Sequence, residues 1–172
     1  FIDLPVISET ASFTNTYLLK SYAELYEDNI SSISLFLQSS FSLKDENIKL
    51  SERIILPSSR LRGFERGKIG PKDGNDYIGG NYAAAINFSS TIPQILSNEE
   101  NLDFLFFVDA ANVWGVDYFD GEEEGNKIRS STGFGIDWLT AVGPLKFTLA
   151  VPITKANTDK TETFRFDLGT TF

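Results

Sequence analysis

Residues 60–80 contain the side chains of this chain that are best suited to bind another charged group. Five basic residues and one acid stand between Arg60 and Lys72, whereas the 172-residue chain carries 15 Lys and Arg against 24 Asp and Glu, a net charge of −9. A basic segment in an acidic protein suggests a surface to dock against. Six glycines and Pro71 in the segment favour a long folded-back loop. Such loops are usually functional or disordered, and the alternative is a solvated surface loop.

Other residues with chemical potential do not form a recognisable catalytic or metal site. The chain has no cysteine and no histidine, which excludes disulfides, thiol nucleophiles, zinc–thiolate sites and imidazole bases. Gly63-x-x-x-Gly67-Lys68 resembles a phosphate-binding loop, but it is one residue short and lacks the Ser or Thr that binds magnesium. Asp103 and Asp109 would lie about 20 Å apart on a strand, too far for an acid–base pair. We therefore expect no enzymatic activity, no cofactor and no metal.

Two charged segments have simple interpretations. The acidic residues between Asp117 and Glu124 lack the alternating spacing of an EF-hand loop, so we interpret them as a solvated loop. The basic cluster could bind nucleic acid, but a sequence pI near 4.5 and the absence of a second basic patch in the sequence argue against this. We expect no nucleic-acid partner.

The segments around the basic loop alternate between apolar and polar residues, which is typical of β-strands with one apolar and one polar face. In residues 31–43, Ile33, Leu35 and Leu37 share one parity, and Ser34 and Gln38 share the other. The same pattern predicts seven strands, at residues 11–26, 31–43, 81–89, 102–114, 127–139, 145–153 and 164–172.

The length of these strands and the charges on their polar faces indicate a membrane barrel. Strands of soluble sandwiches are mostly about 5–6 residues long, whereas strands that cross a bilayer need about 9–11. Charges would be costly in a dry core but not beside a water-filled lumen. The charged residues on the polar faces are Lys20, Glu24, Asp109, Arg129, Asp137, Arg165 and Asp167. We predict an all-β fold, an antiparallel transmembrane β-barrel.

Several motifs resemble the Omp85 superfamily of outer-membrane β-barrel proteins, and they stand in that family's order. Arg62-Gly63-Phe64 resembles the tip of the family's sixth extracellular loop, which folds into the barrel lumen and contacts the inner wall. The other matching segments are Ile69-Gly70-Pro71-Lys72, Gly79-Gly80-Asn81, Phe107-Val108-Asp109-Ala110 with Val113-Trp114, Gly143-Pro144-Leu145, and Phe164 to Phe172.

The resemblance implies that residues 1–172 are the C-terminal part of an Omp85-type barrel. They would form about the last seven of the 16 strands, with loop six at about residues 57–80 directed into the lumen. The POTRA domains and the first barrel strands would be absent from this chain.

The resemblance also places the loop tip against the inner wall. We predict that Arg62 pairs with Asp109, that Gly63 allows the tip to turn, and that Phe64 packs beside the pair. Together, Arg62, Gly63, Phe64 and Asp109 are called the loop lock below. Relatives often carry a second luminal carboxylate where this chain has Ser89, a departure that should weaken the anchoring of Arg62.

The function that the resemblance implies is that of a non-enzymatic insertase, which folds β-barrel proteins into the bacterial outer membrane. Substrate strands would add at a weak seam between the first and last strands. The last strand would supply Phe164, Phe166, Leu168, Gly169 and Phe172, with Gly169 permitting a kink. The implied partners are nascent outer-membrane proteins, outer-membrane lipids and the assembly lipoproteins of the full complex.

Three other functions stay open. A TamA-like translocation factor and a two-partner secretion pore share the Arg-Gly-Phe loop, although Gly70-Pro71-Lys72 followed by Gly79-Gly80-Asn81 favours the BamA branch of the superfamily. A plain porin-like channel would need an open lumen, which a loop carrying Arg62 and Phe64 would plug.

Because seven strands without closure leave two open edges, we also expect the chain alone to associate with itself.

Overall fold

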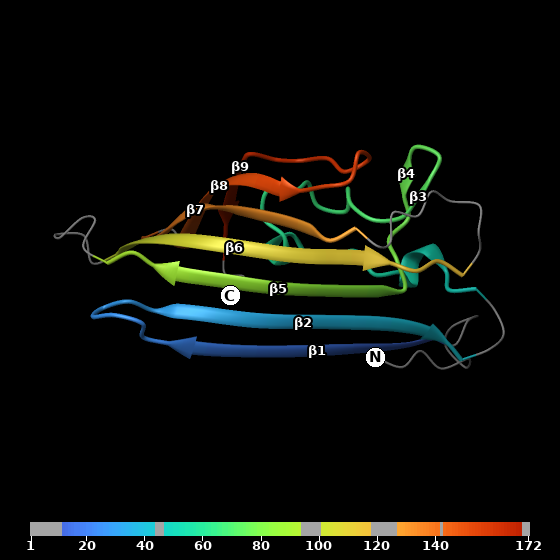
Figure 1. The fold of residues 1–172 in the computed structure, drawn as a ribbon, viewed down its shortest axis with the longest axis horizontal. Helices are drawn as coiled ribbons and strands as arrows, with labels where there is room; N and C mark the ends of the chain where they lie inside the picture. Colours follow the sequence, from blue (N-terminus) through green and yellow to red (C-terminus); the bar gives the residue numbers. More distant parts are fainter. Residues whose placement is uncertain (1–11, 44–46, 94–100, 118–126, 142, 170–172) are drawn as a thin grey trace.

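One antiparallel sheet of seven strands forms most of the structure. The computed structural model describes residues 12–43, 47–93, 101–117, 127–141 and 143–169. The strands follow the order β1-β2-β5-β6-β7-β8-β9 (Figure 1). Their bounds are β1 Ser12–Ala23, β2 Ser31–Ser42, β5 Tyr82–Thr91, β6 Leu102–Trp114, β7 Arg129–Thr140, β8 Gly143–Thr154 and β9 Phe164–Leu168.

All seven predicted strands are present, and the all-β antiparallel fold is confirmed. The long connection between β2 and β5 also contains short elements that alternation did not predict: two 3₁₀ turns at Leu50–Glu52 and Ser58–Arg60, and the hairpin strands β3 (Lys72–Asp73) and β4 (Asp76–Tyr77). Within the described ranges, no helix is long and apolar enough to cross a membrane.

The two faces of the sheet differ in polarity, as period two requires. On one face, aromatic side chains pair across strands, with ring centroids 5.8 Å apart for Phe106 and Phe134 and 5.1 Å apart for Phe147 and Phe166. The other face carries charged groups, among them Lys146, whose Nζ lies 3.0 Å from Oδ2 of Asp137. An apolar face of this kind suits lipid, and a polar face suits a lumen.

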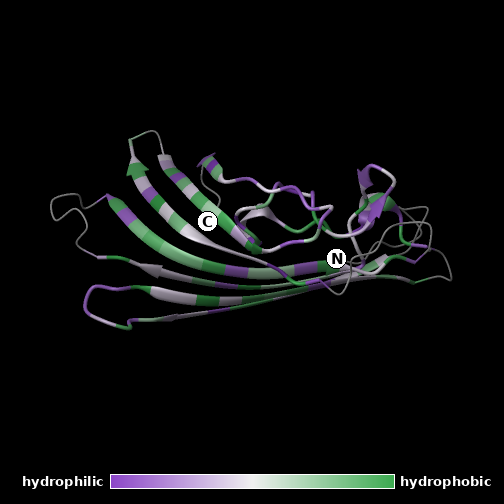
Figure 2. Ribbon diagram, turned by 45° about the horizontal axis from the view of Figure 1, so that its top comes forward, coloured by the Kyte–Doolittle hydropathy of each residue, from purple (hydrophilic) through white to green (hydrophobic). Residues whose placement is uncertain are grey.

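The connection between β2 and β5 lies on the concave face of the curved sheet (Figure 2). Five of its apolar side chains are buried there against inward side chains of β2, β5 and β6. The connection contributes Ile54, Leu56, Leu61, Phe64 and Ile69, and the strands contribute Phe36, Ala83, Ala85, Ala111 and Val113. Where the loop covers it, this face of the sheet is thus a packed apolar core.

The open edges of the sheet carry a prediction. Among the described strands, β1 and β9 each pair with one neighbour only. Many large apolar side chains are more than 50% exposed, including Leu149, Val151 and Ile153 on β8. We expect the 172-residue chain, purified alone, to associate with itself or to need detergent, because open edges and apolar patches drive association. A monodisperse monomer in plain buffer, measured by light scattering, would contradict this expectation.

Candidate functional site

The loop tip is shaped by a tight turn. A 3₁₀ turn at Ser58–Arg60 follows Pro57 and delivers the chain to the concave face. Gly63 then adopts φ +87°, a left-handed conformation that L side chains rarely adopt. Its backbone passes close to the concave face of the sheet, which is called the wall below. A Cβ at this position would lie 3.0 Å from Cβ of Ala150 and 3.3 Å from Cβ of Ser131. Glycine is therefore required both for the turn and for the close approach.

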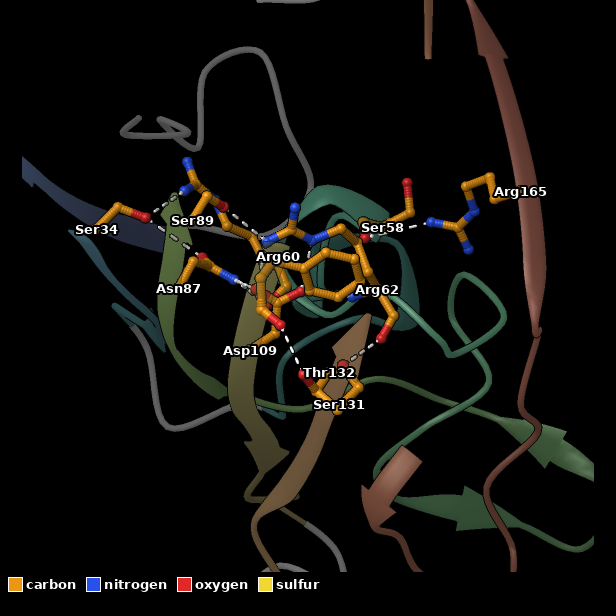
Figure 3. Close-up of polar contacts among 11 residues, drawn as sticks. Ser34, Ser58, Arg60, Arg62, Asn87, Ser89, Asp109, Ser131, Thr132 and Arg165 are labelled. Atoms are coloured by element: carbon orange, nitrogen blue, oxygen red, sulfur yellow. Dashed lines mark hydrogen bonds and ion pairs between the residues drawn. The ribbon is translucent and has the colours of Figure 1, made fainter. Parts of the chain in front are cut away.

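Arg62 and Asp109 form a bidentate ion pair (Figure 3). Nε of Arg62 donates to Oδ2 of Asp109 at 2.7 Å, and Nη2 donates to Oδ1 at 2.7 Å. The same carboxylate accepts from the backbone N–H of Arg62 at 3.0 Å and from Nδ2 of Asn87 at 2.8 Å. Asp109 is 0% exposed, so these four donors replace its hydration.

The wall around this pair supplies further contacts to Arg62. Its guanidinium lies over the ring of Phe107, 3.7 Å from the centroid, which adds a cation–π contact. Nη2 also donates to Oγ of Ser89 at 3.1 Å. A hydroxyl thus accepts from Nη2 at the position where the family resemblance had implied a carboxylate. Only the donor of this bond is charged, so it lacks the attraction between opposite charges that a carboxylate acceptor would add.

The register of the strands brings these wall residues together. Asn87 pairs with Asp109 across β5 and β6, and Asp109 pairs with Ser131 across β6 and β7. Ser131 Oγ donates to the carbonyl of Arg62, and it too is fully buried. The site residues predicted from sequence did not include Asn87, Phe107, Ser131 or Ala150, although Phe107 stands in one of the matching segments. Aligning the predicted strands around Asp109 could have identified the first and third of these.

A prediction arises from the space around Gly63. We expect Gly63→Ala to weaken loop docking by about 2 kcal/mol or more, because it adds left-handed strain of about 1–2 kcal/mol to the contact with Ala150. Gly74→Ala is the matched control, since Gly74 also has positive φ (+57°) but no atom within 4 Å of a built Cβ. Protease sensitivity of the loop in the full-length protein measures the difference. Equal sensitivity of the two variants would contradict the close approach.

Phe64, the remaining member of the loop lock, has a buried side chain. It is 2% exposed and belongs to the core under the loop. Its backbone pairs with Thr161, in the connection between β8 and β9. The structure thus brings all four residues of the loop lock to one region of the concave face.

The predicted seam residues that the structure describes lie on or directly after β9, at one edge of the sheet. Phe164, Phe166 and Leu168 on β9 are 54%, 49% and 64% exposed. Gly169 has φ +135° and follows directly where β9 ends, which fits a glycine that interrupts the strand. Phe172 lies outside the described residues.

Comparison with known proteins identifies the family. Residues 3–172 match the Omp85 superfamily domain. The chain belongs to the Omp85 superfamily. This match covers nearly the whole chain, so it includes the loop tip, the wall strands and β9.

Relatives within the superfamily include assembly factors from bacteria and a fungal protein. The chain is similar to the outer membrane protein assembly factor BamA of Neisseria meningitidis, at 30% identity over 65% of this chain and 17% of that protein. It is also similar to BamA of Neorickettsia risticii, at 27% identity over 77% of this chain and 18% of that protein. A SAM50-like protein of Schizosaccharomyces pombe is 29% identical over 75% of this chain and 28% of that protein.

A solved structure shows the same fold. The crystal structure of BamA from Haemophilus ducreyi lacking POTRA domains 1–3 matches 90% of this chain with a TM-score of 0.79 and 24% identity. This chain covers 34% of that structure and less than a third of each relative named above. The open seven-stranded sheet is therefore a BamA-like barrel fragment.

Proposed function

We propose that this chain is the C-terminal barrel part of a non-enzymatic, BamA-like insertase, with loop six at about residues 57–80. The observation that carries this proposal is the loop lock, a buried Arg62–Asp109 pair that fixes the loop inside the curved sheet. A loop held in this way fills the lumen beside the wall strands with packed side chains. The proposal fits a protein of the bacterial outer membrane, in keeping with the names of the two bacterial relatives.

In the proposed mechanism, β9 is one border of the seam at which substrate strands add by backbone hydrogen bonding. Over the described residues, β9 pairs with β8 at five positions, from Leu145–Leu168 to Leu149–Phe164, and two flanking backbone hydrogen bonds extend this pairing to Thr163 and Gly169, whereas β6 and β7 pair over ten. A short ladder has fewer backbone hydrogen bonds to break, so this border opens more readily than the rest of the sheet. The proposed partners are nascent outer-membrane proteins, outer-membrane lipids and assembly lipoproteins.

Reconstitution tests this function against the alternatives. Full-length protein in liposomes should speed the folding of a urea-unfolded outer-membrane barrel protein, compared with empty liposomes. Acceleration without steady ion conductance supports the insertase. Large steady conductance without acceleration would support a porin-like channel instead. Secretion of a partner protein without acceleration would support a translocation pore of the same superfamily.

A further inference from the structure

The loop has a second attachment, on the connection between β8 and β9. Three backbone hydrogen bonds join the two segments: the N–H of Glu162 donates to Gly63 at 3.0 Å, that of Glu65 to Lys160 at 3.1 Å, and that of Lys160 to Lys68 at 3.1 Å. Residues 63–68 of the loop therefore pair with residues 160–162, like the strands of a short ladder. The tip is held between the wall at Asp109 and this connection.

Arg165 extends this attachment into the last strand. From β9, its Nη1 donates to the carbonyl of Ser58 at 3.3 Å (Figure 3). Its Nη2 donates to the carbonyl of Phe64 at 2.8 Å. Glu162 orients the guanidinium by accepting from Nε at 2.8 Å. The Arg165 side chain is 14% exposed, so these bonds are largely shielded from water. One side chain thus joins β9 to the loop on both sides of Arg62.

The connection between β8 and β9 is itself held by β7 and by the loop. Arg129 at the start of β7 pairs with Asp159, Nε to Oδ2 at 3.0 Å, and both side chains are 0% exposed. Tyr77 of the loop donates to the carbonyl of Thr158. Burial, and then the negative charges of Asp159 and Glu65, raise the pKa of the Tyr77 phenol, which keeps it protonated as a donor. Because these contacts hold the connection between β8 and β9 in place, a movement of β9 would change the hydrogen bonds of Arg165 to the loop.

We propose that Arg165 is a positioning residue that couples the last strand to the loop lock. When β9 leaves its place beside β8, the bonds from Arg165 to Ser58 and Phe64 break, and the loop loses its side-chain attachment to the last strand. Linkage makes this reciprocal, so release of Arg62 from Asp109 loosens β9. The coupling itself is a structural proposal. Its role in opening the seam rests on the proposed function, in which β9 borders that seam.

Hydrogen–deuterium exchange of the full-length protein in lipid, without substrate, tests the coupling. Arg165→Gln is expected to raise amide exchange about tenfold or more at residues 63–68, 160–162 and 164–168, since it removes two hydrogen bonds to the loop and the ion pair with Glu162. Arg62→Gln is expected to raise exchange at residues 164–168 as well. In the Arg165→Gln background, that effect of Arg62→Gln should disappear, because the coupling is already broken.

Two variants serve as controls. Lys146→Gln removes an ion pair with Asp137 beside β9 but none of the contacts to the loop, so exchange at residues 63–68 should stay unchanged. Arg165→Lys keeps the charge and lacks the planar fork, so it should restore protection only in part. It also replaces Arg165→Gln if that variant does not accumulate.

Two results would overturn the proposal. In the first, Arg165→Gln changes exchange at residues 164–168 and leaves residues 63–68 unchanged, which would make Arg165 a local strand contact. In the second, Arg62→Gln raises exchange at residues 164–168 equally with and without Arg165. Because no substrate is present, failure of the insertase function would leave all of these outcomes unaffected.

Discussion

Replacing Asp109 by alanine is expected to release the loop tip and to open residues 57–80 to trypsin. The carboxylate accepts four hydrogen bonds, three from Arg62 and one from Asn87, and it is fully buried. Removing one partner of a buried ion pair costs about 3–5 kcal/mol, because the remaining charge has no partner. The Arg62 side chain is 18% exposed, which places the expected cost at the lower end of that range.

Trypsin digestion of the full-length protein in membranes measures this release, since the loop carries several lysines and arginines. Asp137→Ala is the matched control: it also removes a paired carboxylate, but that group is 38% exposed and its partner is Lys146. Rapid cleavage within residues 60–72 for Asp109→Ala, with Asp137→Ala behaving as the wild type, is the expected result. Indistinguishable digestion of the two variants would contradict the loop lock.

Exchanging the two charges should restore docking only in part. Arg62→Glu places two carboxylates together, and adding Asp109→Arg returns an opposite pair. The restored arginine would, however, meet the backbone N–H of residue 62 and the amide of Asn87, which now donate to the carboxylate. Arg62→Lys keeps the charge but not the fork, so it should dock less well than its charge suggests.

Replacing Phe64 by alanine is the second change with a large expected effect. The ring is 2% exposed within the core under the loop, and loss of a buried phenylalanine typically costs about 3–5 kcal/mol. When cleavage follows the open population, about 3 kcal/mol corresponds to a more than hundredfold faster rate of tryptic cleavage in the loop.

Phe134→Ala is the control for this change, because the same side chain on the opposite face of the sheet is 59% exposed. An exposed substitution shifts stability by about 0.5 kcal/mol, so the cleavage rate should change by a factor of about two. Equal rates for Phe64→Ala and Phe134→Ala would show that the core under the loop does not hold the tip.

The strands could be predicted from sequence because a sheet with one lipid-facing side requires apolar and polar residues to alternate along each strand. Ile33, Leu35 and Leu37 oppose Ser34 and Gln38 whatever the rest of the fold does. The pairing of Arg62 with Asp109 could be anticipated from the motif, since the motif names the cation and strand parity places Asp109 inward. Neither the motif nor the strand parity alone would have been sufficient to predict this ion pair.

The course of the loop could not be predicted, because contacts far apart in sequence decide it. Arg165 meets Phe64 across 101 residues, and Arg129 meets Asp159 only because the register of β7 and the connection bring them together. Small residues on the inner wall gave no signal in an alternation pattern. Gly133, for example, leaves room for the ring of Phe107, since a Cβ there would lie 2.8 Å from Cζ of that ring.

Outer-membrane protein assembly by Arg62→Glu, compared with Arg66→Glu, tests the central claim most directly. Both variants reverse one charge on the same loop, but Arg62 is paired on the wall and Arg66 is exposed. Each full-length variant would be expressed in cells depleted of their own assembly factor, and the amount of folded outer-membrane barrel protein would be measured. We predict severe loss of assembly for Arg62→Glu and near-normal assembly for Arg66→Glu. Equal assembly by the two variants would contradict a role for the loop lock.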